Sequence, residues 1–279
     1  MSGNDGCCES GAVVVVKFGG SVLTGAGAYR RAARFLRNRL RAAPGERYVA
    51  VVSAQEGVTD ALERGARGIV RTPTTRSLDL LWSTGEIRSV ALLTLHLEAL
   101  RVAAAPLNVT ETGLRLNASG ERRFALEPGR LRAALAENHV AVVPGFLGTN
   151  AAGTIVTLGR GGSDLTAVLL ASGLGAARCE LVKDVPGYFS ADPHRDAAAR
   201  HLPALSFAEA LELADRGCDL VQRQAIQAAA SAGLPLVVRS LDESAPVSRV
   251  SAGARAAAAD AGFQYVPAGA VAQAAASAR

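Results

Sequence analysis

The chain has 279 residues, 49% of them hydrophobic, and a formal net charge of +5 at pH 7. This length and apolar content suffice for a large α/β domain or for two lobes around a cleft. Only 4% of the residues are aromatic and the arginines are scattered, which argues against a nucleic-acid partner. No uninterrupted apolar run reaches the length of about 18 residues that a membrane span needs, so no membrane partner is expected.

The two ends of the chain differ in composition from its middle. Residues 1–11 are small and polar, which predicts a disordered leader without a signal peptide. Residues 251–279 are rich in alanine and glycine and are expected to form a tail rather than a second domain. The four cysteines make no CxxC pair, which favours a reduced, cytoplasmic setting. The four histidines lack metal-ligand spacing, so no metal site is expected.

Apolar runs and helical periodicities alternate along the middle of the chain. In chain order they predict a strand at 13–16, a helix at 29–41, a strand at 48–53, a helix from about 59, a helix at 87–101, a strand at 139–143, a hairpin-like passage at 145–164, a helix at 164–172, a strand at 179–182, helices at 207–216 and 220–232, and a strand at 234–238. Strands that alternate with helices indicate an α/β fold, with a mainly parallel sheet covered on both faces.

Two glycine turns follow predicted strands, in "VVVVKFGGSVL" at 13–23 and "LGRGGSDLTA" at 158–167. Ligands of parallel α/β sheets bind beyond the carboxyl ends of the strands, where both turns are expected. Glycine lets backbone N–H groups approach an anion, and a helix N-terminus, here with Ser163 as the expected cap, adds positive potential. With Lys17 between them, the turns predict a phosphate cradle. The motifs GxxxxGK[ST] and GxGxxG are absent.

Five segments together resemble the catalytic domain of the aspartokinases, in the amino acid kinase family. They are "VVKFGGSV", "VVSAQEGVTDAL", "LWSTGEIRSVALL", "PGFLGTNAAGTIVTLGRGGSDLTAVLLA" and "KDVPGYFSADP". The resemblance implies one αβα sandwich domain at 12–250, with an amino-acid-binding lobe at about 12–150 and an ATP-binding lobe at about 151–250. It also implies an ATP- and Mg²⁺-dependent kinase that converts the side-chain carboxylate of L-aspartate to an acyl phosphate, and a homodimer.

The resemblance assigns roles to individual residues. Lys17 and Asp164 are expected to be catalytic. The nucleotide and its phosphates are expected at Gly19, Gly20, Ser21, Gly162, Lys183, Asp184 and Phe189, and the acceptor acid at Thr59, Glu86, Arg160, Gly161 and Ser163. Glu86 would bind the amino group of the acid, and Arg160 its carboxylate through a bidentate fork. The residues leave other interpretations open: Ser83 and Glu86 also fit a capping box, and Asp164 could complement a helix dipole.

The chain departs from the family's pattern at the nucleotide site. Asp219 stands where the family has a nucleotide-contacting lysine, and Lys183 stands where it has a threonine. Lys17 and Lys183 are the only lysines among 30 lysines and arginines, and both end apolar strands. We hypothesise that Lys183 supplies the charge that is missing at position 219.

The departures also bear on function. Two alternatives therefore stay open: a kinase of the same fold that acts on an aspartate analogue or another small acid, and a non-catalytic ligand-binding homologue. The chain ends where aspartokinases continue into ACT regulatory domains, so feedback through that module is not expected.

Overall fold

The computed structural model describes residues 11–117, 124–159, 161–193, 196 and 198–254. The predicted leader at 1–11 and the predicted tail at 251–279 therefore fall almost wholly outside the described residues, as does Arg160.

A mainly parallel sheet of eight strands forms the centre of the molecule, in the order β12-β14-β13-β9-β1-β2-β6-β3. Its strands are β1 (Val13–Phe18), β2 (Arg47–Val52), β3 (Ala104–Pro106), β6 (Val140–Pro144), β9 (Arg178–Val182), β12 (Ala204–Leu205), β13 (Leu236–Arg239) and β14 (Ser248–Val250). All neighbours pair in parallel except β13 and β14. This confirms the predicted sheet. Its two halves come from separate parts of the chain, because β1 and the strands on its β2 side precede β9 and the strands beyond it.

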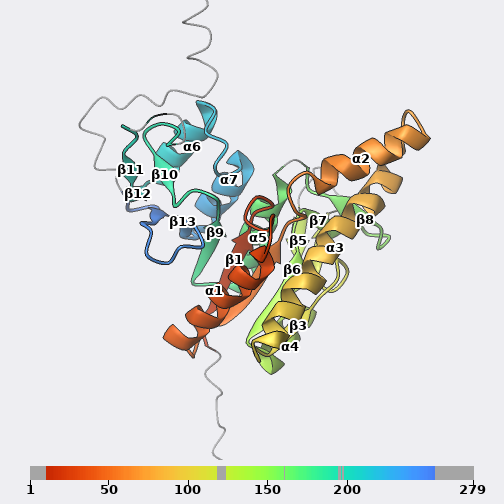
Figure 1. The fold of residues 1–279 in the computed structure, drawn as a ribbon, viewed down its shortest axis with the longest axis horizontal. Helices are drawn as coiled ribbons and strands as arrows, with labels where there is room; N and C mark the ends of the chain where they lie inside the picture. Colours follow the sequence, from red (N-terminus) through yellow and green to blue (C-terminus); the bar gives the residue numbers. More distant parts are fainter. Residues whose placement is uncertain (1–10, 118–123, 160, 194–195, 197, 255–279) are drawn as a thin grey trace, which may run out of the picture.

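Helices cover both faces of the sheet and complete a three-layer αβα sandwich (Figure 1). One face packs on α1 (Ala28–Ala42) and α3 (Thr75–Ala99), and the other on α4 (Gly129–Glu137), α5 (Gly162–Leu174), α6 (Phe207–Asp215) and α7 (Arg223–Ala232). Alternate residues of a strand face opposite sides. Accordingly Val14 and Val16 of β1 join the core under α1, whereas Val15 joins the core under α5. Both faces are buried, which explains the uninterrupted valines in the sequence.

Two smaller sheets lie beside the central one. The first contains β5 (Phe124–Leu126), β4 (Leu114–Leu116), β7 (Leu147–Thr149) and β8 (Ile155–Thr157), and the second pairs β10 (Tyr188–Phe189) with β11 (His201–Leu202). Antiparallel pairing of β7 with β8 confirms the hairpin predicted within 145–164. The sequence analysis missed α4 and most of the short strands. Strands of two or three residues carry too little periodicity to be recognised.

Helix α3 begins twelve residues earlier than its predicted start at position 87. Its N-cap is Thr74, whose hydroxyl oxygen accepts a hydrogen bond of 3.3 Å from the backbone N–H of Ser77. Ser83 and Glu86 therefore lie inside the helix, and the capping-box interpretation was wrong. The Ser83 hydroxyl instead donates to the carbonyl oxygen of Leu80. Glu86 is thereby free of a capping role, and it lines the same cleft as Lys17 of β1.

Candidate active site

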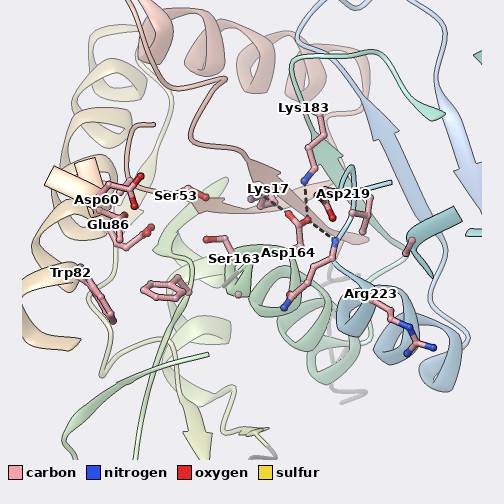
Figure 2. Close-up of a pocket in the computed structure, with 18 of the residues that line it drawn as sticks. Lys17, Ser53, Asp60, Trp82, Glu86, Ser163, Asp164, Lys183, Asp219 and Arg223 are labelled. Carbon is pink, nitrogen blue, oxygen red and sulfur yellow. Dashed lines mark hydrogen bonds and ion pairs between the residues drawn. The ribbon is translucent and has the colours of Figure 1, made fainter. Parts of the chain in front are cut away.

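A cleft of about 710 Å³ opens at the carboxyl ends of β1 and β9. Helix α5 points its N-terminus into it, and α2 (Val58–Ile69), α3 and the segment before α7 complete its walls. This is the edge of a parallel sheet at which ligands are expected. Figure 2 shows the labelled side chains in two groups, with Asp60, Trp82 and Glu86 at one end and Lys17, Asp164 and Lys183 at the other.

Asp164 binds two lysines at the second end of the cleft. The ammonium nitrogen of Lys17 lies 2.7 Å from Oδ1 of Asp164, and that of Lys183 lies 2.8 Å from Oδ2. The backbone N–H of Gln222 also donates to Oδ2, over 3.3 Å. Burial by itself would raise the pKa of Asp164, but the charges of Lys17 and Lys183 outweigh it and hold that pKa far below its usual range. Asp164 is therefore a fixed negative charge between two cations.

Two glycines, Gly161 and Gly162, allow the start of α5 to pack closely against the segments around it. Gly161 is the N-cap, with a left-handed backbone (φ 72°), and no side chain caps this helix. The expectation that Ser163 is the cap was therefore wrong; Ser163 belongs to the first turn of the helix and lines the cleft. A Cβ on Gly162 would lie 2.8 Å from Cβ of Leu158, so a larger residue would push the turn away. The turn carries Ser163 and Asp164 into the cleft (Figure 2).

Glu86 lies at the first end of the cleft, and only 3% of its surface is exposed. Burial raises the pKa of this carboxyl to about 8, although a backbone hydrogen bond from Ala54 and the charge of Lys17 partly oppose the rise. Its Oε2 atom has no hydrogen-bond partner within the described residues. A buried acceptor without a partner is costly, so this oxygen is suited to a donor that a ligand brings.

The approach of α3 to the turn after β2 explains how Glu86 reaches this position. A Cβ on Gly85 would lie 3.0 Å from Cβ of Ala54 and 3.2 Å from Cγ1 of Val58. Glycine thus permits the helix to pack closely against the segment that carries Thr59, which also lines the cleft.

The structure brings most of the predicted site residues into one cleft. Those that line it are Lys17, Thr59, Glu86, Gly161, Gly162, Ser163, Asp164 and Lys183. Gly19, Gly20 and Ser21 follow β1 but are not among the lining residues; the N–H of Gly19 donates to the carbonyl oxygen of Val182 over 3.2 Å. Neither Asp184 nor Phe189 is among the lining residues; Asp184 is exposed and Phe189 packs on His201. Arg160 lies outside the described residues.

Trp82 and Phe146 also line the cleft, and the sequence analysis did not select them. Their ring centroids are 6.1 Å apart, and the buried Nε1 atom of Trp82 has no hydrogen-bond partner among the described residues. Trp82 precedes Glu86 by four positions, which places both on one side of a helix. That signal was unused because the predicted helix began only at position 87. Phe146 has a positive φ of 67°, a backbone conformation that the sequence does not predict for a phenylalanine.

Other kinds of site find no support in the part of the chain that the structure describes. There, no group of three or more His, Cys, Asp or Glu side chains could hold a metal ion. No described helix combines the length and the apolar character needed to cross a membrane. Cys179 is a buried free thiol.

The fold and the cleft together define an α/β protein with a cleft at the carboxyl edge of its sheet, where two lysines lie at one end and the buried carboxyl group of Glu86 lies at the other. Comparison with known proteins makes this more specific. The model of the amino acid kinase family matches residues 12–240. The chain belongs to the amino acid kinase family.

Its relatives include several aspartokinases. The chain is 40% identical to the aspartokinase of Thermus thermophilus over 198 residues, which are 70% of this chain and 49% of that protein. It is 37% identical to the aspartokinase of Geobacillus stearothermophilus over 232 residues, which are 82% of this chain and 56% of that protein. The chain thus spans about half the length of these curated relatives.

Solved structures show the same fold. Aspartate kinase from Synechocystis superposes with a TM-score of 0.77 at 35% identity, covering 86% of this chain and 40% of that one. Aspartokinase III of E. coli in complex with aspartate and ADP superposes with a TM-score of 0.70 at 27% identity, covering 86% of this chain and 64% of that one. These matches confirm the αβα sandwich expected from the resemblance.

Proposed function

We propose that this protein is an ATP-dependent kinase that phosphorylates the side-chain carboxylate of L-aspartate to an acyl phosphate. One observation carries the proposal: a single cleft holds two lysines on Asp164 at one end and, at the other, the buried Glu86 carboxyl, whose Oε2 has no partner among the described residues. The end with the two lysines suits phosphates, and the end with Glu86 suits an ammonium group. The aspartokinase relatives, and the solved aspartokinase III complex with aspartate and ADP, support the same assignment.

The chemistry needs no general base from the protein. A carboxylate nucleophile has an unperturbed pKa near 4 and is already ionised at neutral pH. Catalysis then consists of aligning the acceptor carboxylate with the γ-phosphate and stabilising the charge that develops during transfer. Lys17 is the penultimate residue of the buried strand β1 and presents its charge at this point, while Asp164 keeps the ammonium group in place.

Mg²⁺ neutralises charge on the transferred phosphate when it is bound. Such an ion usually takes one or two protein carboxylates and completes its shell with phosphate and water oxygens. Asp164 and Asp219 line the phosphate end, and lysines hold both oxygens of Asp164. Asp164 and Asp219 would therefore supply only a minority of the Mg²⁺ ligands, and the phosphate oxygens of the nucleotide would supply most of them.

The acceptor acid would bind at the opposite end of the cleft. Its amino group would donate to Oε2 of Glu86, with Thr59 beside it. From the resemblance alone, Arg160 would bind its carboxylate. Gly161 and Ser163 would lie between acceptor and phosphate at the first turn of α5. Residues 12–150 would then form the acceptor lobe and residues 151–250 the nucleotide lobe, with Gly19, Gly20, Ser21, Gly162, Asp184 and Phe189 around the nucleotide.

A hydroxylamine trap for acyl phosphates tests the proposal, with ATP and a panel of small carboxylic acids. We expect hydroxamate with L-aspartate, and a loss of about 100-fold or more in Lys17→Ala. Hydroxamate from a different acid only would replace the proposal with a kinase for an aspartate analogue. Ligand binding without turnover of any acid would instead identify a non-catalytic homologue.

Two further assignments belong to the same proposal. The protein would work in a reducing, cytoplasmic setting, which the absence of a CxxC pair and the free thiol of Cys179 support. It would also form a homodimer, as an isologous pair of identical chains.

A further inference from the structure

Lys17 and Lys183 emerge side by side from the same edge of the sheet. Strands β1 and β9 are parallel neighbours, with Lys17 opposite Leu181 and Phe18 opposite Val182. Lys183 comes directly after Val182, the last residue of β9. Both side chains line the cleft, and Figure 2 shows them reaching toward Asp164 from different strands.

One carboxylate serves both ammonium groups. Asp164 is 5% exposed as a side chain, Lys17 8% and Lys183 13%, so all three charges are largely withdrawn from water. Two positive charges against one negative charge leave a surplus of one at this point. A surplus charge in a partly buried site is unfavourable without a counterion. The geometry thus favours an anion in the cleft beside the lysines.

Other acidic groups do not remove this surplus. Asp219 lines the same cleft but is exposed, as is Asp184 next to Lys183 in the sequence. Charges that face solvent are screened by water and salt, so they compensate a withdrawn ammonium group only weakly. A purely structural role also explains Lys183 poorly, because Lys17 alone would neutralise Asp164. Each ammonium has three N–H donors, and a single carboxylate oxygen leaves donors for a ligand.

We infer that Lys183 is a second phosphate-binding residue, which joins Lys17 on the β- or γ-phosphate of the nucleotide, and that Asp164 positions both ammonium groups. The inference rests on the nucleotide site of the proposed function but is independent of which acid is the acceptor. The compact ammonium suits two cations that share one carboxylate, which is consistent with lysine at these two positions in a chain that otherwise uses arginine.

Nucleotide titrations without any acceptor acid test this inference. ATP and AMP are titrated separately, by calorimetry, into the wild-type protein and into Lys183→Met. We expect the variant to lose about 10- to 100-fold in affinity for ATP, as for a lost charged hydrogen bond, with little change for AMP. Arg115→Gln is the control for net charge. Arg115 pairs with Glu127, both side chains are exposed, and neither residue lines the cleft. This variant should bind both nucleotides like the wild type.

Two further variants separate phosphate binding from support of the fold. Lys183→Gln keeps a donor for Asp164 without the charge, and it should show the same selective loss for ATP even if Lys183→Met does not fold. Asp219→Lys, added to Lys183→Thr, returns a cation to the same cleft and should recover part of the ATP affinity. Equal losses for ATP and AMP, wild-type ATP affinity in a folded Lys183→Gln, or no ATP binding by the wild type would each overturn the inference.

The hydroxylamine trap tests the identity of the acceptor acid, whereas the titrations test Lys183 at the phosphate site, so either result can fail without the other. Selective loss of ATP affinity without any aspartyl hydroxamate would leave Lys183 assigned and remove only aspartate as the acceptor. Aspartyl hydroxamate formed by the wild type, together with unchanged ATP binding by Lys183→Gln, would keep the function and remove Lys183 from the phosphate site.

Discussion

The ammonium nitrogen of Lys17 lies 2.7 Å from Oδ1 of Asp164. This contact joins the end of the central strand β1 to the first turn of α5, two segments that are far apart in the sequence. Both side chains are buried, so the pair is both a link between two layers of the fold and the base of the cleft.

Asp164→Asn should therefore affect stability as well as activity. The substitution leaves two ammonium groups close together without their counterion, and breaking a buried ion pair typically costs about 3–5 kcal/mol. We expect a drop of that order in the free energy of unfolding, measured with urea at pH 7, and an almost complete loss of product. Asp242→Asn, at an exposed position whose contacts to Ser244 and Ala245 are local, is the control and should change stability by less than about 1 kcal/mol.

The same ion pairs predict an effect of acid. The pKa of Asp164 is lower in the folded protein than in the unfolded chain, so its contribution to stability is complete above the unfolded value of about 4 and declines as the pH falls below it. The wild type should lose more stability than Asp164→Asn between pH 6 and pH 3. Parallel pH profiles for the two proteins would contradict a depressed pKa at Asp164.

Glu86 predicts the opposite dependence on pH. Its folded pKa of about 8 exceeds the ordinary value of a glutamate, so its contribution to stability is complete at low pH and declines as the pH rises toward 8. Glu86→Gln keeps the size of the side chain and removes the titration. Between pH 6 and pH 9, urea unfolding should show a loss larger in the wild type than in the variant by about 2 kcal/mol. Equal losses would place the pKa of Glu86 near its normal value.

The protonation of Glu86 also predicts proton release when the acceptor binds. At pH 7 a carboxyl with a pKa of about 8 is mainly neutral, and an ammonium group beside it favours the ionised form. Binding of L-aspartate at pH 7 should release up to one proton, which calorimetry in two buffers of different ionisation enthalpy measures. Glu86→Gln should abolish this release. A binding enthalpy of the wild type that is independent of buffer would remove Glu86 from the amino-group site.

The two adjacent glycines after β1 should differ in their tolerance of a side chain. A Cβ on Gly20 would lie 2.8 Å from the carbonyl oxygen of Ala54, a backbone atom that cannot easily move. A Cβ on Gly19 would meet nothing closer than 3.5 Å, although it would lie 3.7 Å from the ammonium nitrogen of Lys17. We expect Gly20→Ala to lower the free energy of unfolding by about 1–3 kcal/mol and Gly19→Ala to lower it much less. Gly19→Ala should instead raise the KM for ATP. Equal stabilities would show that the turn adapts.

A homodimer is the expected assembly, and it can be measured directly. Among the residues that the structure describes, the exposed large apolar ones are Ile69 and Val70 at the end of α2 and Leu80, Ile87 and Leu95 on α3. Such residues are available for an isologous contact between identical chains. Light scattering should give twice the chain mass of 28.6 kDa at micromolar concentration. A monomer mass that does not change with concentration would contradict the dimer.

The amino-acid sequence by itself determined the fold class and the edge at which the site lies. Valine runs such as 13–16 can be buried on both faces only in a sheet with helices on each side, which predicts the layers. The carboxyl ends of parallel strands meet at one edge, so the sequence placed Lys17 and Lys183 at the same edge, but only the pairing of β1 with β9 brings them side by side. The glycines at 161–162 predicted the tight turn that begins α5, because glycine adopts backbone conformations that other residues rarely do.

Only the tertiary structure decided how the side chains in the cleft interact. That Lys17 and Lys183 share the two oxygens of Asp164, and that Glu86 is buried against Ala54 with one oxygen unpaired, depends on contacts between segments distant in sequence. Local patterns favoured a capping box at Ser83, but α3 begins at Thr75 because its earlier residues, such as Leu78 and Asp79, also find a buried face to pack against. Burial and charge pairing depend on residues that are neighbours in space. They override the local helix and capping preferences of the sequence, because tertiary packing contributes more to the stability of a helix than those preferences do.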